Sequence, residues 1–81
     1  MAYAYVLKSL NHQRTYTGST NDLVRRLFEH NNGYGVFSKR YKPWKVVYKE
    51  EFIDIKMARI REKYLKSAAG RRFIKKNGMF D

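Results

Sequence analysis

Apolar and polar positions alternate over the first twenty residues in a way that predicts two strands. Residues 3–10 (YAYVLKSL) are rich in aromatic and branched side chains, which are enriched in strands. Residues 14–20 (RTYTGST) have the same character, and the polar segment 9–12 between them is typical of a hairpin connection. The chain therefore begins with a predicted β-hairpin.

The register of this hairpin determines whether two tyrosines meet. If the hairpin is centred between Leu10 and Asn11, Tyr5 and Tyr16 face each other on the same side of the sheet. A slip by one residue would separate them, because successive residues of a strand point to opposite faces. We expect the paired arrangement.

The segment that follows the hairpin has apolar residues at helical spacing. Asn21 or Asp22 is the expected N-cap of a helix that runs to about Asn32 and is closed by Gly33. Four apolar residues form its predicted inner face: Leu23, Val24, Leu27 and Phe28.

Basic side chains lie beside that apolar face. Arg26 and His30 are four residues apart and are expected along one edge of it, whereas Arg25 points into solvent. His30 also has a structural explanation, because a histidine at a helix C-terminus is stabilised by the helix dipole.

A basic loop at 34–42 precedes a third strand at 44–52, which begins after Pro43. Alternation places four apolar side chains of this strand on one face, with Glu50 as the exception in the series: Trp44, Val46, Tyr48 and Phe52.

The C-terminal third predicts two more helices. Asp54 caps a helix at about 55–67, Gly70 interrupts the helical pattern, and RRFIKK forms a short basic helix. The expected apolar stripe of the first of these helices comprises Met57, Ile60, Tyr64, Leu65 and Ala68. Arg61 lies within this stripe, so it needs a carboxylate or carbonyl partner and is interpreted as structural.

The order β-β-α-β-α-α predicts an α+β fold, a small three-stranded antiparallel sheet flanked by helices. A length of 81 residues suits one domain, 1–81. The chain has no cysteine, which excludes disulfides, thiolate zinc sites and thiol nucleophiles. Without a recognisable signal peptide or membrane span, we expect a cytoplasmic protein, taken as a monomer.

Charge changes the picture most. The chain has 18 Lys and Arg against 7 Asp and Glu, a net charge of +11, which indicates a polyanionic partner. Nucleic acid is favoured over an anionic membrane, because the basic residues are not gathered on one long amphipathic helix. Seven of them are expected to contact phosphates, with a solvated surface as the alternative: Lys39, Arg40, Lys42, Arg71, Arg72, Lys75 and Lys76.

The residue types present suit phosphodiester hydrolysis. This reaction needs an activated water, a cation that spreads the charge developing on phosphorus, and help for the leaving oxygen. Tyr or His can supply the base, Arg the cation, and a carboxylate can hold Mg²⁺ or Mn²⁺.

Several segments together resemble the GIY-YIG nucleases. The resemblance begins in the segments 3–5 (YAY), 16–18 (YTG) and 21–27 (NDLVRRL), and continues in KPWKVVYKEEF and ARIREKYLKS. It covers nearly the whole chain and is nearest to the small single-domain bacterial members. Tyr-Ala replaces the usual Gly-Ile of the first element, and Thr17 replaces a branched aliphatic residue, but neither change removes a reacting group.

The resemblance implies roles for five residues. By position, Tyr5 and Tyr16 are the two signature tyrosines, Arg26 is the helix arginine, His30 the frequent histidine and Glu62 the metal-binding glutamate. The family mechanism implies that Glu62 holds one Mg²⁺ or Mn²⁺ and that Tyr16, aided by Tyr5 or His30, activates the water. Arg26 would neutralise the transition-state oxygens.

The expected function is a metal-dependent endonuclease, with DNA as the first candidate substrate in repair or recombination. Glu62 could instead be a surface acid that pairs with Arg59 or Lys66 along its helix. Two alternatives remain for the whole chain: a non-catalytic nucleic-acid-binding module of the same fold, and an adaptor that docks an acidic protein. The choice between DNA and RNA stays open.

Overall fold

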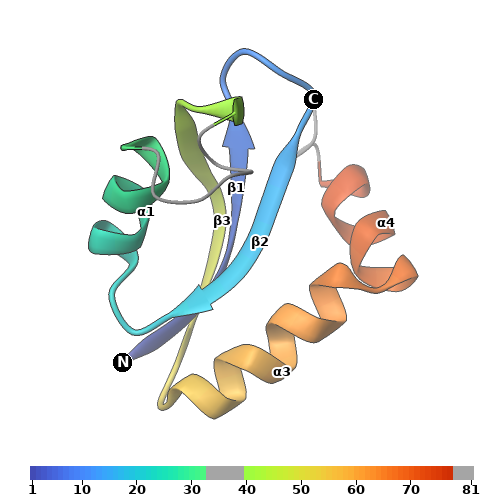
Figure 1. The fold of residues 1–81 in the computed structure, drawn as a ribbon. Coiled ribbons are helices and arrows are strands. Elements are labelled where there is room, and N and C mark those ends of the chain that lie inside the picture. The colour runs from blue at the N-terminus through green and yellow to red at the C-terminus, as the bar shows by residue number, and fades with distance from the viewer. Residues whose placement is uncertain (33–39, 78–81) are drawn as a thin grey trace.

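The computed structural model describes residues 1–32 and 40–77. Its elements are β1 (Ala2–Ser9), β2 (Thr15–Thr20), α1 (Leu23–Asn31), β3 (Trp44–Phe52), α3 (Ile55–Lys66) and α4 (Ala68–Lys76). The strands form one antiparallel sheet in the order β2-β1-β3 (Figure 1). The predicted α+β class and the element order are confirmed.

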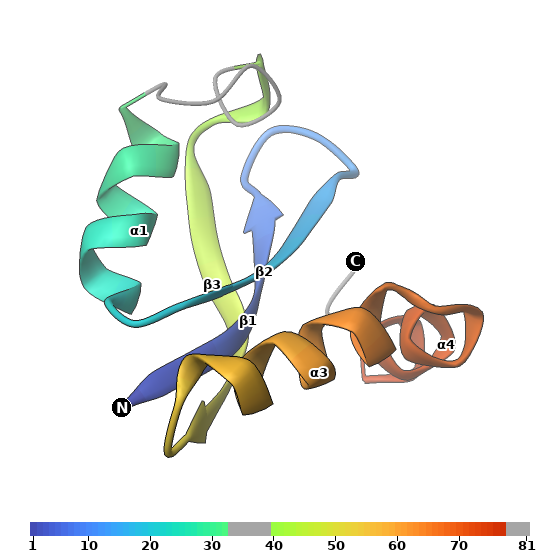
Figure 2. The same cartoon turned by 60° about the horizontal axis from the view of Figure 1, so that its bottom comes forward.

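The sheet lies between two layers of helix. Helix α1 covers one face, and α3 with α4 covers the other (Figures 1 and 2). The central strand β1 is therefore buried on both sides: Tyr5 and Leu7 pack toward α1, whereas Ala4 and Val6 pack toward α3 and α4. This two-sided burial explains why β1 reads as a nearly continuous apolar run. None of the helices in the described part of the chain is long and apolar enough to cross a bilayer.

The register of the hairpin differs from the expected one. Tyr5 pairs with Gly18, and Tyr16 pairs with Leu7, so the partner of Tyr5 is two residues further along β2 than predicted. A shift of two residues preserves the face of every side chain. The tyrosines are thus diagonal neighbours on the same face, with ring centroids 6.4 Å apart.

The predicted common face of β3 is wrong, because the strand contains a β-bulge. Leu7 pairs with Val46 while the preceding Val6 pairs with Tyr48, which leaves Val47 as an extra residue. Trp44 and Val46 consequently pack on the α1 side, and Tyr48 and Phe52 on the side of α3 and α4. Alternation alone could not reveal this switch.

The inner face of α1 is rotated from the predicted one. Val24 is 82% exposed and Phe28 58% exposed, whereas His30 is buried and Leu23 and Leu27 pack against the sheet. His30 can be buried because the Tyr5 hydroxyl provides a hydrogen-bond partner. The helix therefore turns its polar edge inward and leaves two large apolar side chains outside.

The apolar stripe predicted for α3 is also mostly wrong. Met57, Ile60 and Tyr64 are exposed, and the buried residues of the helix are Ala58 and Leu65. The small Ala58 side chain allows the helix to lie close to the sheet, a role that a search for large apolar residues overlooks.

Arg61 has the partner that its position requires. Its Nε donates to the Glu50 carboxylate over 3.0 Å, and its guanidinium also lies over the rings of Tyr64 and Phe73. The predicted carboxylate partner of Arg61 is therefore present, and it is Glu50, the polar exception in β3.

The break between the last two helices comes at Ser67, not at Gly70 as predicted. Ser67 ends α3 and caps α4, with its hydroxyl accepting from the Gly70 N–H. Gly70 itself lies inside α4, where its missing side chain lets the helix contact the backbone of Leu65 directly.

We predict that Gly70→Ala destabilises the protein by about 1–3 kcal/mol, because the added methyl group would overlap the backbone at Tyr64 and Leu65. In an exposed helix the same change would be stabilising by about 1 kcal/mol. Urea unfolding measures the difference, with Arg72→Ala on the exposed side of α4 as the control. An unchanged or higher unfolding free energy in Gly70→Ala would contradict the packing argument.

Candidate functional site

Three aromatic side chains from three elements meet on the α1 side of the sheet. The hydroxyl of Tyr5 on β1 and Nε2 of His30 on α1 form a hydrogen bond of 3.3 Å. The ring of Tyr16 on β2 lies 4.4 Å from the ring of His30, between centroids. Tyr5 and His30 are buried, and Tyr16 is half-buried. The structure thus brings together three of the predicted site residues.

Gly18 allows Tyr5 to reach this position. A Cβ atom on Gly18 would lie only 2.6 Å from the Tyr5 hydroxyl oxygen and 3.2 Å from the Tyr16 ring. The Tyr5 phenol therefore lies across the backbone of β2, which is an edge strand of the sheet. Any other residue at this position would displace one of the two tyrosines.

Arg26 supplies the positive charge of the cluster. Hydrogen bonding to the Tyr5 hydroxyl raises the pKa of Arg26, and its interactions with Glu29 and Tyr16 act in the same direction. The Arg26 side chain is 43% exposed, so it can contact both the tyrosines and an anion from solvent. Arg26 is permanently cationic and faces the cluster, as the sequence predicted.

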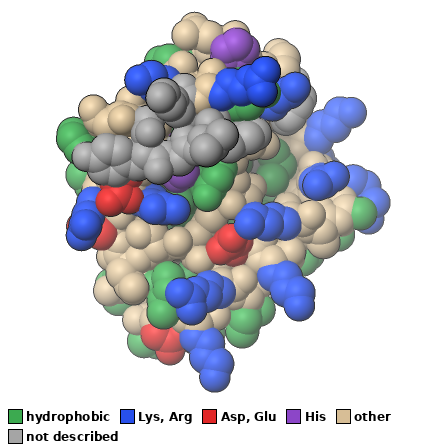
Figure 3. All heavy atoms as spheres, viewed as in Figure 1, with side chains coloured by type: hydrophobic (Ala, Val, Ile, Leu, Met, Phe, Trp, Pro, Cys, Tyr) green, Lys and Arg blue, Asp and Glu red, His purple; other side chains and the backbone are tan. Residues whose placement is uncertain are grey.

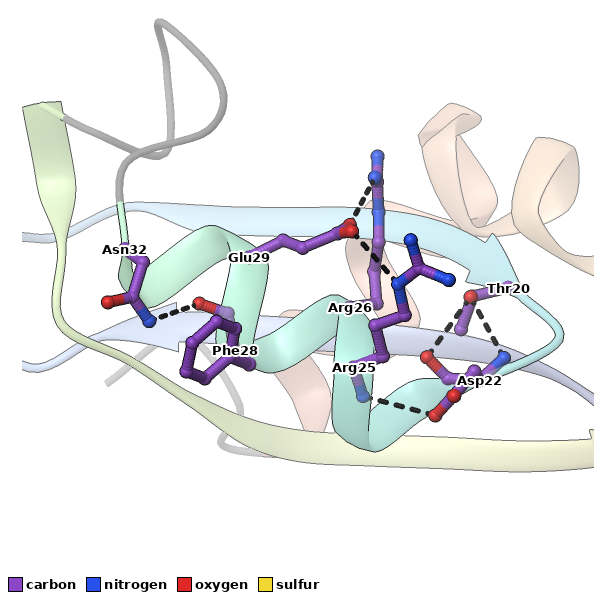
Figure 4. A network of polar contacts seen from close by, with 7 residues as sticks. All are labelled: Thr20, Asp22, Arg25, Arg26, Phe28, Glu29 and Asn32. Atoms are coloured by element: carbon purple, nitrogen blue, oxygen red, sulfur yellow. Dashed lines mark hydrogen bonds and ion pairs between the residues drawn. The ribbon is translucent and has the colours of Figure 1, made fainter.

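Glu29 fixes the direction of Arg26. Its carboxylate accepts from Arg26 over 3.1 Å and from Arg25 over 3.3 Å, and Figure 4 shows it between the two guanidinium groups. Asp22 caps the same helix by accepting from the Arg25 N–H, and Thr20 bonds to the Asp22 backbone. The start of α1 is therefore held to the end of β2.

The local environment shifts the pKa values of Tyr5 and His30 in opposite directions. Burial raises the pKa of Tyr5 to about 12, although hydrogen bonding to Arg26 partly opposes the rise. Burial, together with the charge of Arg26, lowers the pKa of His30 from 6.5. At neutral pH both groups are uncharged, so their hydrogen bond joins two neutral partners next to a fixed cation.

Glu62 lies on the opposite side of the edge strand. Its carboxylate accepts from the Ser19 hydroxyl over 2.5 Å and pairs with Lys66 over 2.7 Å. Burial would raise the pKa of Glu62, but the hydrogen bonds from Lys66 and Ser19 outweigh it and the pKa is lowered. The carboxylate is ionised, and its charge contributes to the raised pKa of Tyr5.

These contacts place the two halves of the site on either side of Gly18 and Ser19. Tyr5 crosses β2 at Gly18 from the α1 side, and the next residue, Ser19, holds Glu62 from the α3 side. The structure thus brings Tyr5, Tyr16, Arg26 and His30 together on the α1 side of β2. It places Glu62 on the α3 side, beside Ser19.

The donor set fits a single hard cation. Mg²⁺ and Mn²⁺ prefer oxygen ligands, and Mg²⁺ commonly binds one or two carboxylates together with water and substrate phosphate. Glu62 offers an ionised, half-buried carboxylate with the Ser19 hydroxyl beside it. Among the described residues, no group of three or more His, Cys, Asp or Glu side chains is placed to hold a metal, so solvent and substrate would complete the coordination.

The predicted phosphate contacts fall on two regions. Arg71, Arg72, Lys75 and Lys76 are exposed along α4, where Figure 3 shows basic side chains over much of the face formed by α3 and α4. Arg40 and Lys42 are exposed just before β3. Lys39 lies outside the described residues.

Sequence reasoning missed the residues that position the predicted ones. Gly18 was noted only as part of a motif, and the partners Ser19 and Glu29 were not singled out. The spacing of Glu29 from Arg25 and Arg26, four and three residues, could have indicated the ion pairs. Asn31 was missed as well: its amide bonds the backbone N–H and C=O of Trp44, which ties α1 to β3.

Comparisons with known proteins identify the family of this chain. The profile of the GIY-YIG catalytic domain matches residues 1–77. A UPF0213 protein of Clostridium perfringens is 42% identical over 67 residues, which cover 82% of this chain and 71% of the relative. A UPF0213 protein of Staphylococcus saprophyticus is 35% identical over 63 residues, covering 76% of this chain and 74% of the relative. No solved structure matches significantly.

We predict that stability falls as the pH is lowered from about 7.5 to 5.5, with His30 as a principal cause. Because its folded-state pKa is below 6.5, the unfolded chain binds the proton more readily, and protonation favours unfolding. Urea unfolding at several pH values should show a shallower dependence for His30→Gln. The exposed His12 provides the control, and a His12→Gln variant that loses the same pH dependence would refute the assignment.

Proposed function

Because the chain belongs to the GIY-YIG catalytic domain family, a nuclease family, we propose that it is a metal-dependent endonuclease that hydrolyses phosphodiester bonds, with DNA as its substrate. The observation that supports this most is the cluster of Tyr5, Tyr16, Arg26 and His30 on one side of the edge strand, with Glu62 bound to Ser19 on its other side. We further propose that residues 1–81 act as one nuclease domain in the cytoplasm, in DNA repair or recombination.

Tyr16 is the base in this proposal. Tyr5 is buried and its pKa of about 12 keeps its proton in place, so Tyr5 is suited to orient rather than to accept a proton. Tyr16 is half-buried, contacts His30 and interacts with Arg26. It is therefore the tyrosine placed to act, in its phenolate form, as the base that takes a proton from a water molecule at the edge of β2.

Arg26 acts on the phosphate. Its charge does not depend on pH, and Glu29 holds it in a fixed direction. A preorganised cation of this kind stabilises the charge that develops on the non-bridging oxygens. Neutral His30 keeps Tyr5 in place without adding a second positive charge beside Arg26.

Glu62 would hold the divalent ion, Mg²⁺ or Mn²⁺, on which nucleases of this family generally depend. Bound there, the ion would supply positive charge to the scissile phosphate and the leaving oxygen. Ser19 orients the carboxylate by donating to one oxygen, and Lys66 forms an ion pair with the other.

A cleavage assay tests the proposal directly. The protein is incubated with supercoiled plasmid and with single-stranded, flapped and branched DNA, in Mg²⁺ or Mn²⁺ and in EDTA. Metal-dependent nicking or cutting is expected. Binding of all substrates without cleavage in either metal would favour the non-catalytic binding module instead.

We predict that Glu62→Gln abolishes metal-dependent cleavage but leaves DNA binding in EDTA within about threefold of the parent. A metal ligand matters most when charge builds up in the transition state, and less for docking of the substrate. Glu51→Gln removes the same charge from an exposed position on β3 and should cleave normally. Parent-like cleavage by Glu62→Gln would exclude Glu62 as the ligand.

We predict that Tyr16→Phe lowers the cleavage rate by about 10²–10⁴-fold, the usual contribution of a general base. The ring and its contact with His30 remain, so the melting temperature should change little. Tyr3→Phe removes a hydroxyl that bonds to Glu51 on β3 and serves as the matched control. A Tyr16→Phe variant with the parent rate would remove Tyr16 from the mechanism.

A further inference from the structure

A groove runs along the free edge of β2 on the side of α4. Its outer part is a cavity of about 440 Å³ between the β1–β2 hairpin and α4, lined by Gln13, Arg14, Thr15, Arg71, Ile74 and Lys75. A second cavity of about 390 Å³ shares Thr15, Arg71 and Ile74 with the first and extends to Tyr16 and Lys66. The shared residues make the two cavities one continuous groove, the β2–α4 groove.

The groove combines an apolar floor with a cationic rim. Ile74 and Leu65 are buried and form part of its lining. Arg14, Arg71 and Lys75 stand around its outer part, and no Asp or Glu occurs among the described residues that line either cavity. A ligand that fits must carry negative charge and a flat or apolar portion, as a nucleotide does with its phosphate and base.

Arg14 is held in place at the mouth of the groove. Its guanidinium lies 5.3 Å from the centroid of the Tyr41 ring and donates to the Gln13 carbonyl. These contacts leave other N–H donors of the guanidinium fork for a phosphate.

The groove leads directly to the candidate active site. Thr15, Tyr16 and Thr17 line it, and the next residues of β2 are Gly18, which Tyr5 approaches from the α1 side, and Ser19, which donates to Glu62 on the α3 side. The four steps from Thr15 to Ser19 span about 13 Å at the usual strand rise of about 3.3 Å per residue. That distance corresponds to about four stacked nucleotides at about 3.4 Å each.

The surface at the opposite end of β2 carries mixed charge. The cavity there, about 340 Å³, includes Arg25, Arg26 and Arg59 but also the carboxylates of Asp22 and Glu29. Mixed charge binds a polyanion less well than uniform positive charge. The surface around the site is therefore electrostatically asymmetric along β2.

We propose that the β2–α4 groove is a subsite for the nucleic-acid strand on one side of the scissile bond. Arg14, Arg71 and Lys75 contact its phosphates, and Ile74 packs against a base or sugar. This inference rests on the proposed function, and it adds that the enzyme needs about four nucleotides on one side of the cut and fewer on the other.

The chain offers a matched pair of variants on α4. Arg71→Ala/Lys75→Ala removes two cations that line the groove, and Arg72→Ala/Lys76→Ala removes two exposed cations of the same helix that line neither cavity. Both variants lose the same net charge, so a general loss of electrostatic attraction affects them equally. Any difference between them reports the groove itself.

Binding is measured in EDTA by fluorescence anisotropy with a labelled single-stranded oligonucleotide and with a duplex, over a range of salt. The groove pair should weaken binding at least about fivefold more than the control pair. It should also reduce the slope of log K against log salt by about 1.4 for the single strand, or 1.8 for the duplex, if two phosphate contacts are lost. Equal effects of the two variants on affinity and slope would overturn the subsite.

A length series tests the asymmetry. Substrates that are shortened from one end, and then from the other, are cleaved by the parent and by both variants. The parent should lose efficiency when fewer than about four nucleotides remain on one side only, and the groove pair should lose this length dependence. Equal length requirements on both sides would overturn the proposal.

Different results would overturn the proposed nuclease function and the proposed subsite. The binding experiment needs no catalysis, so a groove effect on affinity can appear even if the protein does not cleave. Cleavage by both variants with parent-like affinity would leave the nuclease proposal intact and remove the subsite. A polyglutamate probe whose binding weakens in the groove pair as much as that of the oligonucleotide would also overturn it, because the groove would then recognise negative charge alone.

Discussion

The approach of the Tyr5 phenol to the backbone of Gly18 is the constraint on which the site depends. A side chain at position 18 would overlap the Tyr5 hydroxyl, so only glycine lets a tyrosine from the central strand extend across the edge strand. From that position the hydroxyl contacts His30, interacts with Arg26 and is influenced by Glu62. Because Gly18 has no side chain, the Tyr5 hydroxyl can interact with residues of α1 on one face of the sheet and is influenced by a residue of α3 on the other.

An edge strand ordinarily exposes backbone groups that invite pairing with another chain. In this protein the same edge is flanked by cationic side chains along α3 and α4 and by the cluster on α1. Positive charge along the edge discourages association with a second copy of the same basic chain, and it favours a polyanion. The feature that protects the sheet edge is therefore also the feature that suits it to a nucleic-acid strand.

The sequence was sufficient for the order of elements, because caps and turn residues mark their ends locally. Asp22, Asp54 and Ser67 all accept hydrogen bonds from the backbone at helix starts, although Ser67 was overlooked in favour of Gly70. The common face of Tyr5 and Tyr16 was predicted correctly from a wrong register, since the error was an even number of residues. The bulge at Val47 was not predictable, because it depends on how two strands match across the sheet.

The five predicted site residues come from the resemblance, and the structure supplies the reason for their positions. Periodicity alone placed the inner face of α1 on Val24 and Phe28, which are exposed. Their exposure is the consequence of turning Arg26 and His30 toward Tyr5, because one helix cannot present both edges to the sheet.

Polar and apolar side chains also compete for the inner face of α3, where Arg61 and Glu62 are partly buried while Met57 and Ile60 are exposed. Arg61 serves the fold through its ion pair with Glu50, and Glu62 faces the edge of β2 through Ser19. Burial of polar groups at the cost of apolar contacts is destabilising unless each group has a partner, and each of these does. Both helices thus depart from the most hydrophobic orientation at the point where they approach β2, and departures of this kind are expected at functional sites.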